Sequence, residues 1–195
     1  MMKRIFDITA SSLGLLCLSP LFLVLAGWIK CDSKGPVFYR QVRVGRNNKD
    51  FRLYKFRSMR PDSDKLGLIT VGGRDPRVTR SGYYIRKYKL DEFPQLINVL
   101  LGDMSLVGPR PEVRKYVDMY TPEQMHILDV RPGITSLASL TYRNENDILA
   151  AAEDPDRAYI EQVMPDKLAI DLQYVDKASL TTDIKLIFKT LTAIV

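Results

Sequence analysis

The sequence predicts an α+β protein: a re-entrant N-terminal membrane helix, followed by a compact, mainly helical cytoplasmic domain with a small β-hairpin. Two observations favour this fold class, an uncharged apolar segment at residues 8–29 and, after it, one β-rich region followed by several amphipathic helical patterns. The chain has 195 residues, 46% of them hydrophobic and 27% charged, which is enough for one globular domain with a sizeable core. We therefore expect a membrane anchor at residues 1–34 and a single domain at residues 35–195.

The apolar segment at residues 8–29 is long enough to cross a membrane, because its 22 residues would form a helix of about 33 Å. Pro20 lies near its middle, where it removes a helical hydrogen bond, and Ser19 can bond to a freed carbonyl. Basic residues flank both ends, namely Lys3, Arg4, Lys30 and Lys34. We expect a helix bent at Ser19-Pro20 that returns to the cytoplasmic leaflet, because this topology keeps both basic clusters at one membrane face.

Two other interpretations of the segment stay open. A signal peptide is disfavoured because no small-residue cleavage site follows. An ordinary transmembrane span would send the basic domain to the far side or leave only seven residues outside. Asp7 is costly in lipid unless it pairs, and we expect its partner to be Arg4 or the membrane interface. Trp28 is expected to act as an interfacial anchor.

The net charge of +6 and the pI near 9.3 favour phosphates, nucleic acid or an anionic membrane surface as partners. Basic residues are concentrated between Arg40 and Lys89, and most of those up to Arg60 are expected to face lipid head groups. The chain contains two cysteines, Cys17 and Cys31, and one histidine, His126. A disulfide framework, a Cys/His zinc site and a Ser/His/Asp triad are therefore poorly supported, and His126 is expected to be structural or on the surface.

A β-hairpin is expected at residues 37–59. The segments 37–44 and 51–59 are rich in β-branched and aromatic residues, and the turn-forming residues 45–50 separate them. Residues 61–81 form a polar loop with little periodicity, which could close over a site.

Helical patterns follow at residues 93–101, 112–119, 145–152, 166–176 and 182–194. In the first of these, Pro94 suits the opening turn and Gly102 the C-terminal stop. The last carries one apolar stripe that we interpret as core rather than membrane contact, formed by Ile184, Ile187, Phe188, Leu191 and Ile194.

Asp91 and Glu92 fall at the N-terminus of the helix expected at 93–101. Adjacent helical side chains point about 100° apart, so the pair is poorly placed to share a proton across a bond. A helix N-terminus favours an ionised carboxylate and bound phosphate, which suits a nucleophilic Asp that attacks phosphorus. Spacing alone favours the simpler interpretation that both residues cap the helix.

Two arginines lie in rigid turns of proline and glycine. Arg110 stands between two prolines in Gly108-Pro109-Arg110-Pro111, and Arg131 precedes Pro132-Gly133. An arginine held in this way loses little entropy when it binds an anion, so both are candidate anion ligands.

A series of motifs extends from residue 3 to about residue 190. They are Lys3-Arg4-x-x-Asp7, Ser19-Pro20 in the apolar segment, Tyr54-Lys55-Phe56-Arg57-Ser58-Met59, Arg86 with Leu90-Asp91-Glu92, the stretch from Gln95 to Pro111, and Arg131-Pro132-Gly133-Ile134-Thr135. In order and length these motifs closely resemble those of the bacterial monotopic phosphoglycosyltransferases, the bacterial sugar transferases that start glycoconjugate assembly.

The resemblance implies an enzyme at the cytoplasmic face of the bacterial inner membrane. It would move a phospho-sugar from a UDP-sugar to polyprenyl (undecaprenyl) phosphate and release UMP, with Mg²⁺ required. The family's dyad matches Asp91 as the nucleophile that carries the phospho-sugar and Glu92 as its partner, both also candidate metal ligands. The match further implies substrate phosphate binding by Lys55, Arg86, Arg110, Arg131 and, from a shorter motif, Asp171.

The segment after Thr135 departs from the family pattern. Many members continue with Gly-Trp-Ala-Gln-Val, whereas residues 136–145 here read SLASLTYRNE. We expect this region to affect the choice of sugar, which the sequence leaves unassigned along with the oligomeric state. The competing interpretation is a membrane-anchored basic protein that binds nucleic acid or anionic lipid without catalysis. Because the chain lacks nucleic-acid-binding motifs, we expect no nucleic-acid partner.

Overall fold

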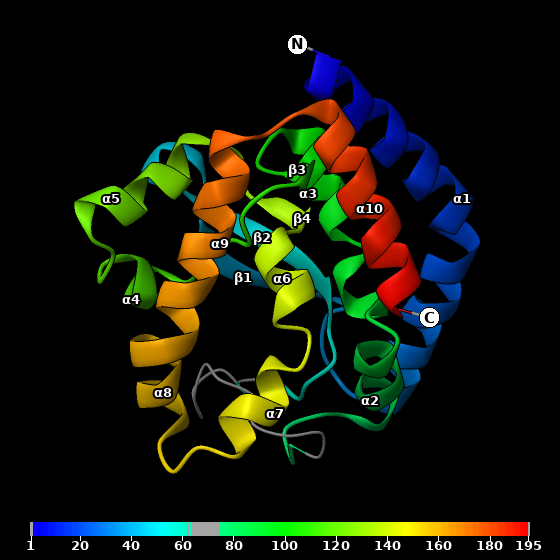
Figure 1. Cartoon of the computed structure of the whole chain (residues 1–195). Coiled ribbons are helices and arrows are strands. Elements are labelled where there is room, and N and C mark those ends of the chain that lie inside the picture. Colours follow the sequence, from blue (N-terminus) through cyan, green and yellow to red (C-terminus); the bar gives the residue numbers. More distant parts are fainter. Residues whose placement is uncertain (1, 62, 64–74, 195) are drawn as a thin grey trace.

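A long helix, α1 (Met2–Asp32), runs along one side of a mixed, helix-rich domain (Figure 1). The computed structural model describes residues 2–61, 63 and 75–194. Within this part of the chain, α1 is the one helix that is long and apolar enough to cross a membrane. Large hydrophobic side chains along it are exposed, including Leu13, Leu16, Leu23 and Val24. The expected apolar helix is therefore confirmed, while its re-entry and the 1–34/35–195 division stay predictions.

Ser19 partly replaces the hydrogen bond that Pro20 removes from α1. Pro20 has no N–H to donate to the carbonyl of Leu16, four residues earlier. The Ser19 hydroxyl donates to that carbonyl at 2.8 Å, as predicted. Figure 1 shows α1 bowed along its length, which agrees with a weakened backbone ladder at this point.

The expected hairpin is confirmed as the antiparallel strands β1 (Phe38–Val44) and β2 (Asp50–Phe56), which pair from Phe38 with Phe56 to Val44 with Asp50. Asn47 and Asn48 in the connecting turn have positive φ, which asparagine tolerates better than most residues. Most of the loop expected at 61–81, residues 62 and 64–74, lies outside the described residues. Its end corrects the prediction, because helix α2 (Arg80–Lys87) already begins at Arg80.

A second sheet, which the sequence did not predict, pairs β3 (Ser105–Val107) in parallel with β4 (Gly133–Thr135). The two backbones meet closely at Gly108 and Gly133. A Cβ added to Gly133 would lie 2.1 Å from the backbone nitrogen of Gly108, so only glycine fits there. The Gly133 N–H also donates to the Pro109 carbonyl at 2.9 Å, so the backbone of the turn that carries Arg110 lies against the residues that follow Arg131.

The five predicted helices are confirmed with shifted boundaries: α3 (Gln95–Leu101), α4 (Arg114–Val117), α7 (Glu145–Ala150), α9 (Met164–Asp176) and α10 (Leu180–Ile194). Gly102 ends α3 with φ +95°, as its predicted stop requires. The structure adds the short helices α5 (Pro122–Met125), α6 (Leu137–Thr141) and α8 (Pro155–Ala158). It also contains the 3₁₀ turns η1 (Arg46–Asn48), η3 (Leu90–Glu92) and η4 (His126–Asp129), and the π-helical turn η5 (Tyr159–Val163).

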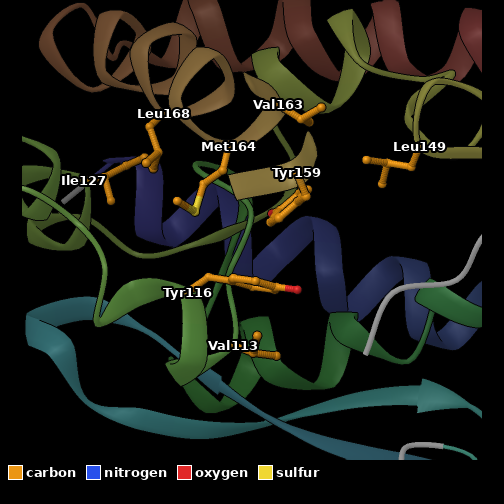
Figure 2. Close-up of a cluster of buried hydrophobic side chains, with 8 residues drawn as sticks. All are labelled: Val113, Tyr116, Ile127, Leu149, Tyr159, Val163, Met164 and Leu168. Carbon is orange, nitrogen blue, oxygen red and sulfur yellow. The ribbon is translucent and has the colours of Figure 1, made fainter. Parts of the chain in front are cut away.

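The largest buried cluster joins the C-terminal helices to the middle of the chain (Figure 2). It contains Val113, Tyr116, Ile127, Leu149, Tyr159, Val163, Met164 and Leu168. The rings of Tyr116 and Tyr159 lie 4.9 Å apart, an aromatic contact that packs η5 against α4. This cluster fixes α7, η5 and α9 relative to the rest of the domain.

Polar residues in the first two turns of α1 fasten it to the domain, and they correct the pairing expected for Asp7. Asp7 is 2% exposed and accepts hydrogen bonds from Ser105 Oγ at 2.9 Å and the Leu106 N–H at 3.2 Å. Arg4 instead donates to the carbonyls of Val99 and Leu100, at the C-terminal end of α3 that favours a cation. The Asp7–Arg4 pair is therefore wrong, because each residue finds a partner inside the domain.

The stripe on α10 is largely not core, contrary to prediction. Phe188 is 64% and Leu191 57% exposed, whereas Asp183 and Leu186 are buried. The ion pair between Lys3 and Asp183 joins the first turn of α10 to the first turn of α1.

The basic region from Arg40 to Arg60 divides into exposed and engaged residues. Arg40 and Arg52 are exposed, as expected for a surface that faces lipid head groups. Arg43 and Arg57 contradict that expectation because groups inside the protein bind them. Arg43 forms an ion pair with Glu112 at 3.0 Å, and Arg57 is 5% exposed and donates to carbonyls at the C-terminal end of α1.

Candidate active site

The Asp91–Glu92 pair occupies η3, the 3₁₀ turn between α2 and α3. Lys89, just before this turn, has left-handed backbone angles, which reverse the chain after α2. Pro94 then caps α3 with helical angles. Both carboxylates therefore lie just before this helix, in a separate turn, and neither caps it, so the capping interpretation is wrong. Asp91 is 7% exposed.

Two cations bind Glu92. Lys55 Nζ, from β2, lies 3.1 Å from Glu92 Oε1. Arg110 donates one N–H to each Glu92 oxygen, at 2.5 and 3.2 Å, so its planar fork grips the carboxylate from the turn after β3. Burial raises the pKa of Glu92, but the charges of Arg110 and Lys55 outweigh it and hold that pKa well below its ordinary value. Burial lowers the pKa of Lys55, and the Glu92 carboxylate opposes this effect.

Asp91 differs from its neighbour in having no hydrogen-bond partner among the described residues. Burial raises the pKa of Asp91, Lys55 opposes the shift, and the adjacent Glu92 adds to it. The charge of Arg86 on α2 also opposes the shift. A desolvated carboxylate is suited to act as a nucleophile toward phosphorus when its oxygens accept no hydrogen bonds and cations lie nearby.

A cavity of about 910 Å³ opens in front of the pair. Five of the seven residues predicted for catalysis and phosphate binding line it: Lys55, Arg86, Asp91, Glu92 and Arg110. The sequence separates these residues widely, and the hairpin, α2, η3 and the β3 turn bring them together.

Arg131 and Asp171 do not line the cavity formed by the described residues. Arg131 Nε donates to the carbonyl of Gly102 at 2.8 Å, at the C-terminal end of α3. Asp171, on α9, is 4% exposed and accepts a hydrogen bond from the Ala138 N–H at 3.0 Å. Burial raises the pKa of Asp171 to about 6. Hydrogen bonds from the backbone N–H groups of Ala138 and Arg110 and from the Ser136 hydroxyl lower this pKa but do not outweigh burial.

Comparison with known proteins assigns the chain to a family. The model of the bacterial sugar transferase family matches residues 1–195. The chain belongs to the bacterial sugar transferase family. This result confirms the resemblance that the motifs indicated.

Relatives of this sugar transferase act on different sugars, according to their names. It is 43% identical to the UDP-N-acetylgalactosamine-undecaprenyl-phosphate N-acetylgalactosaminephosphotransferase of Aeromonas hydrophila, across 98% of this chain and 43% of the relative. It is 40% identical to the UDP-glucose:undecaprenyl-phosphate glucose-1-phosphate transferase of Klebsiella pneumoniae, across 96% of this chain and 39% of the relative. It is 38% identical to the uncharacterized sugar transferase EpsL of Bacillus subtilis strain 168, across 97% of this chain and 85% of the relative. The chain therefore spans less than half of the first two proteins and most of the third.

Asn98 does not line the cavity that the described residues form but supports it from behind, and the sequence analysis gave it no role. It is fully buried; its side chain accepts from the Tyr54 N–H at 2.9 Å and donates to the Arg52 carbonyl at 2.8 Å. These bonds join α3 to β2 and thus fix Lys55 relative to Glu92. A signal was present, since Asn98 is a polar residue among the apolar positions of α3.

The site suits a Mg²⁺ ion that is coordinated partly by substrate phosphates rather than by protein side chains alone. Among the described residues no group of three or more His, Cys, Asp or Glu side chains could hold a metal. Mg²⁺ commonly binds one or two carboxylates together with substrate phosphates, and Asp91 and Glu92 supply two carboxylates at the cavity wall. Glu92 already accepts three N–H groups, so Asp91 has the less occupied oxygens.

Proposed function

We propose that this sugar transferase moves a phospho-sugar from a UDP-sugar to undecaprenyl phosphate through a covalent intermediate on Asp91. The observation that carries the proposal is the Asp91 carboxylate, which lines a large cavity without a hydrogen-bond partner among the described residues, next to cations. The names of the relatives support undecaprenyl phosphate as the acceptor and UDP-sugars as donors. The observed geometry adds a nucleophile and a charge environment that suit such a transfer.

In the first step, an Asp91 oxygen attacks the phosphorus bonded to the donor sugar. The bond between this phosphorus and the bridging oxygen of the diphosphate breaks, and UMP leaves with both electrons of that bond. Negative charge develops on the leaving phosphate and on the transferred group. Lys55, Arg86 and Arg110 line the cavity, where cations can stabilise this charge.

In the second step, a phosphate oxygen of undecaprenyl phosphate attacks the same phosphorus. The bond from phosphorus to Asp91 breaks, which regenerates the carboxylate and forms the polyprenyl-diphosphate-sugar. Glu92 keeps Lys55 and Arg110 in position through both steps, since it binds the two cations simultaneously. When bound, Mg²⁺ would neutralise phosphate charge, and Asp91 and Glu92 are the residues that would hold it.

Arg131 and Asp171, which were predicted to bind substrate phosphate, are proposed to position the site instead. Arg131 binds the end of α3 opposite to the dyad. Asp171 binds backbone N–H groups of Ala138 and Arg110, and therefore the turn that presents the Arg110 side chain. In each case the bound backbone belongs to a segment that is close in sequence to a residue of the cavity.

We also propose that the enzyme works at the cytoplasmic face of the bacterial inner membrane. The acceptor has a lipid tail, so its phosphate must be reached from the bilayer surface. Helix α10 connects the two environments, because Thr190 and Ala193 line the cavity while Phe188 and Leu191 on the same helix are exposed. Trp28 is 41% exposed and lies 5.9 Å from the Tyr84 ring, which fits an aromatic anchor at the interface.

The experiment compares Asp91→Asn with Asp118→Asn, a matched change on an exposed residue whose side chain is 62% accessible. The parent should release UMP from at least one UDP-sugar in the presence of undecaprenyl phosphate. Without acceptor, it should gain the mass of one phospho-sugar. Asp91→Asn should fold, lose more than about a thousandfold in turnover and show no adduct, whereas Asp118→Asn should behave like the parent.

Two outcomes would contradict the proposal. Turnover of Asp91→Asn within tenfold of the parent would exclude Asp91 as the covalent nucleophile. A parent enzyme that releases UMP from no UDP-sugar would exclude the function itself.

A further inference from the structure

The cavity wall has two chemically different parts. One part, from the hairpin end and α2, is strongly basic and includes Arg60, Arg86 and Lys87. The other part comes from the segment between α6 and α7, from α7 itself, and from η5 and α9. It contains hydroxyl and amide groups, one carboxylate and two cations, namely Tyr142, Arg143, Asn144, Glu145, Asn146, Tyr159 and Lys167. A carboxylate repels phosphate but accepts hydrogen bonds from hydroxyl and amide groups. In the second part Lys167 is paired with Glu145, and hydroxyl and amide groups surround the pair, so this part is suited to a portion of a substrate that is rich in hydrogen-bonding groups.

Glu145 is the carboxylate in that second part, and its position is fixed. Glu145 Oε2, from the first turn of α7, lies 2.7 Å from Lys167 Nζ on α9. The Lys167 ammonium also lies over the Tyr159 ring, 5.5 Å from its centroid. Tyr159 and the α7 residue Leu149 belong to the core cluster in Figure 2, so packing holds both partners. The ion pair uses one of the lone pairs of Glu145 and leaves the others available.

The location of Glu145 relative to Arg110 indicates which part of the donor it would meet. Glu145 and Arg110 line the same cavity. Glu92 and, after it, Glu145 raise the pKa of Arg110, which agrees with this shared location. In the proposed reaction the transferred phosphate lies beside Asp91, which lines this cavity as well. In a UDP-sugar, one oxygen joins that phosphate to the sugar, whereas the second phosphate separates it from the ribose. The group within reach of Glu145 is therefore the sugar.

We propose that Glu145, held by Lys167, accepts hydrogen bonds from hydroxyl or amide N–H groups of the donor sugar and thereby contributes to sugar selection. This assignment rests on the proposed function. A site that holds an acceptor in a fixed position for a substrate hydroxyl discriminates against donors that lack or misplace this hydroxyl, because the hydrogen bond is then lost. Glu145 belongs to the segment 136–145, where the sequence departs from the family pattern.

The test compares the parent with Glu145→Gln, Glu145→Asp and the control Glu161→Gln. Glu161 has a 55% exposed side chain and pairs with Arg157 on the surface, away from the cavity lining. The measurement is kcat/KM for UDP-glucose, UDP-galactose, UDP-N-acetylglucosamine and UDP-N-acetylgalactosamine, together with the inhibition constant of UMP, which lacks a sugar. Glu145→Asp retains the charge but withdraws it by one methylene, so it also serves if Glu145→Gln does not fold.

We expect both Glu145 variants to lower kcat/KM for the best donor about tenfold or more and to change the ratios between donors. The inhibition constant of UMP should stay within about twofold, and Glu161→Gln should match the parent throughout. Equal losses for all donors accompanied by weaker UMP inhibition would overturn the assignment and place Glu145 at the nucleotide. Unchanged donor ratios would overturn it as well. A parent that uses no UDP-sugar would instead refute the proposed function.

Discussion

The replacement Asp171→Asn tests how the fold supports the turn that carries Arg110. Asp171 is buried, and burial raises its pKa from the ordinary 3.8 to about 6. The folded protein therefore binds more protons than the unfolded chain between about pH 4 and pH 6. Stability from this residue is fully present below pH 4, is lost as the pH rises through that window, and stays reduced above it.

The size of this effect follows from the two pKa values. A tenfold difference in proton affinity corresponds to about 1.4 kcal/mol, so the change from 3.8 to about 6 corresponds to about 3 kcal/mol at neutral pH. Asparagine has nearly the same shape and can still accept from the Ala138 N–H, but it cannot ionise. Relative to the parent, the variant should therefore gain about 3 kcal/mol between pH 4 and pH 7, which is roughly 6 to 12 °C in Tm for a chain of this size.

The assay is thermal unfolding of the detergent-solubilised protein at several pH values from 4 to 7.5, for the parent, Asp171→Asn and the control Asp176→Asn. Asp176 is an exposed residue on the same helix, so its replacement should leave the pH dependence unchanged. Other carboxylates contribute equally to the parent and the variant, and their effects cancel in the difference. A difference between Asp171→Asn and the parent that does not change with pH would refute the reasoning.

Arg110→Lys should lower kcat/KM roughly 10- to 150-fold, because lysine keeps the charge but cannot bind both Glu92 oxygens. The control is Arg157→Lys on the surface. Parent-like kinetics of Arg110→Lys would show that the planar guanidinium is dispensable. Replacement of Ser19 and Pro20 by Ala and Leu should straighten α1 and move its N-terminus outward, detected by an impermeant thiol reagent at a cysteine placed at position 2 in a background without the native cysteines. Labelling of the unaltered helix from the periplasm would reject re-entry.

The sequence predicted the elements whose patterns extend over several turns or strand positions. The hairpin, α3, α9 and α10 each carry enough apolar periodicity to be recognised. Strands β3 and β4 have three residues each, too few for a pattern, and their pairing depends on a close approach of Gly108 and Gly133. Short elements that tertiary contacts stabilise leave little trace in local sequence.

Which face of a helix is buried, and which groups a side chain binds, were harder to predict than the helices and strands themselves. An apolar stripe has the same composition whether it packs on a core or faces lipid, so the sequence could not show that Phe188 and Leu191 would be exposed. Arginine is normally solvated, and nothing local to Arg57 indicates that carbonyls at the end of α1 would bind it. The sequence analysis proposed Asp91, Glu92 and the cations around them only because these residues lie in long motifs that resemble those of one family.

The contacts at the base of α1 connect the membrane helix with both halves of the proposed active site. Arg4 binds the carbonyl end of α3, and the opposite end of α3 follows the turn with Asp91 and Glu92. Asp7 binds β3, and that strand leads directly into the turn with Arg110. The first two turns of α1 therefore hold the elements that present the nucleophile side and the cation side of the cavity. In the proposed function the acceptor phosphate lies at the bilayer surface. The depth of α1 in the membrane would then set how far the proposed catalytic groups lie from this surface.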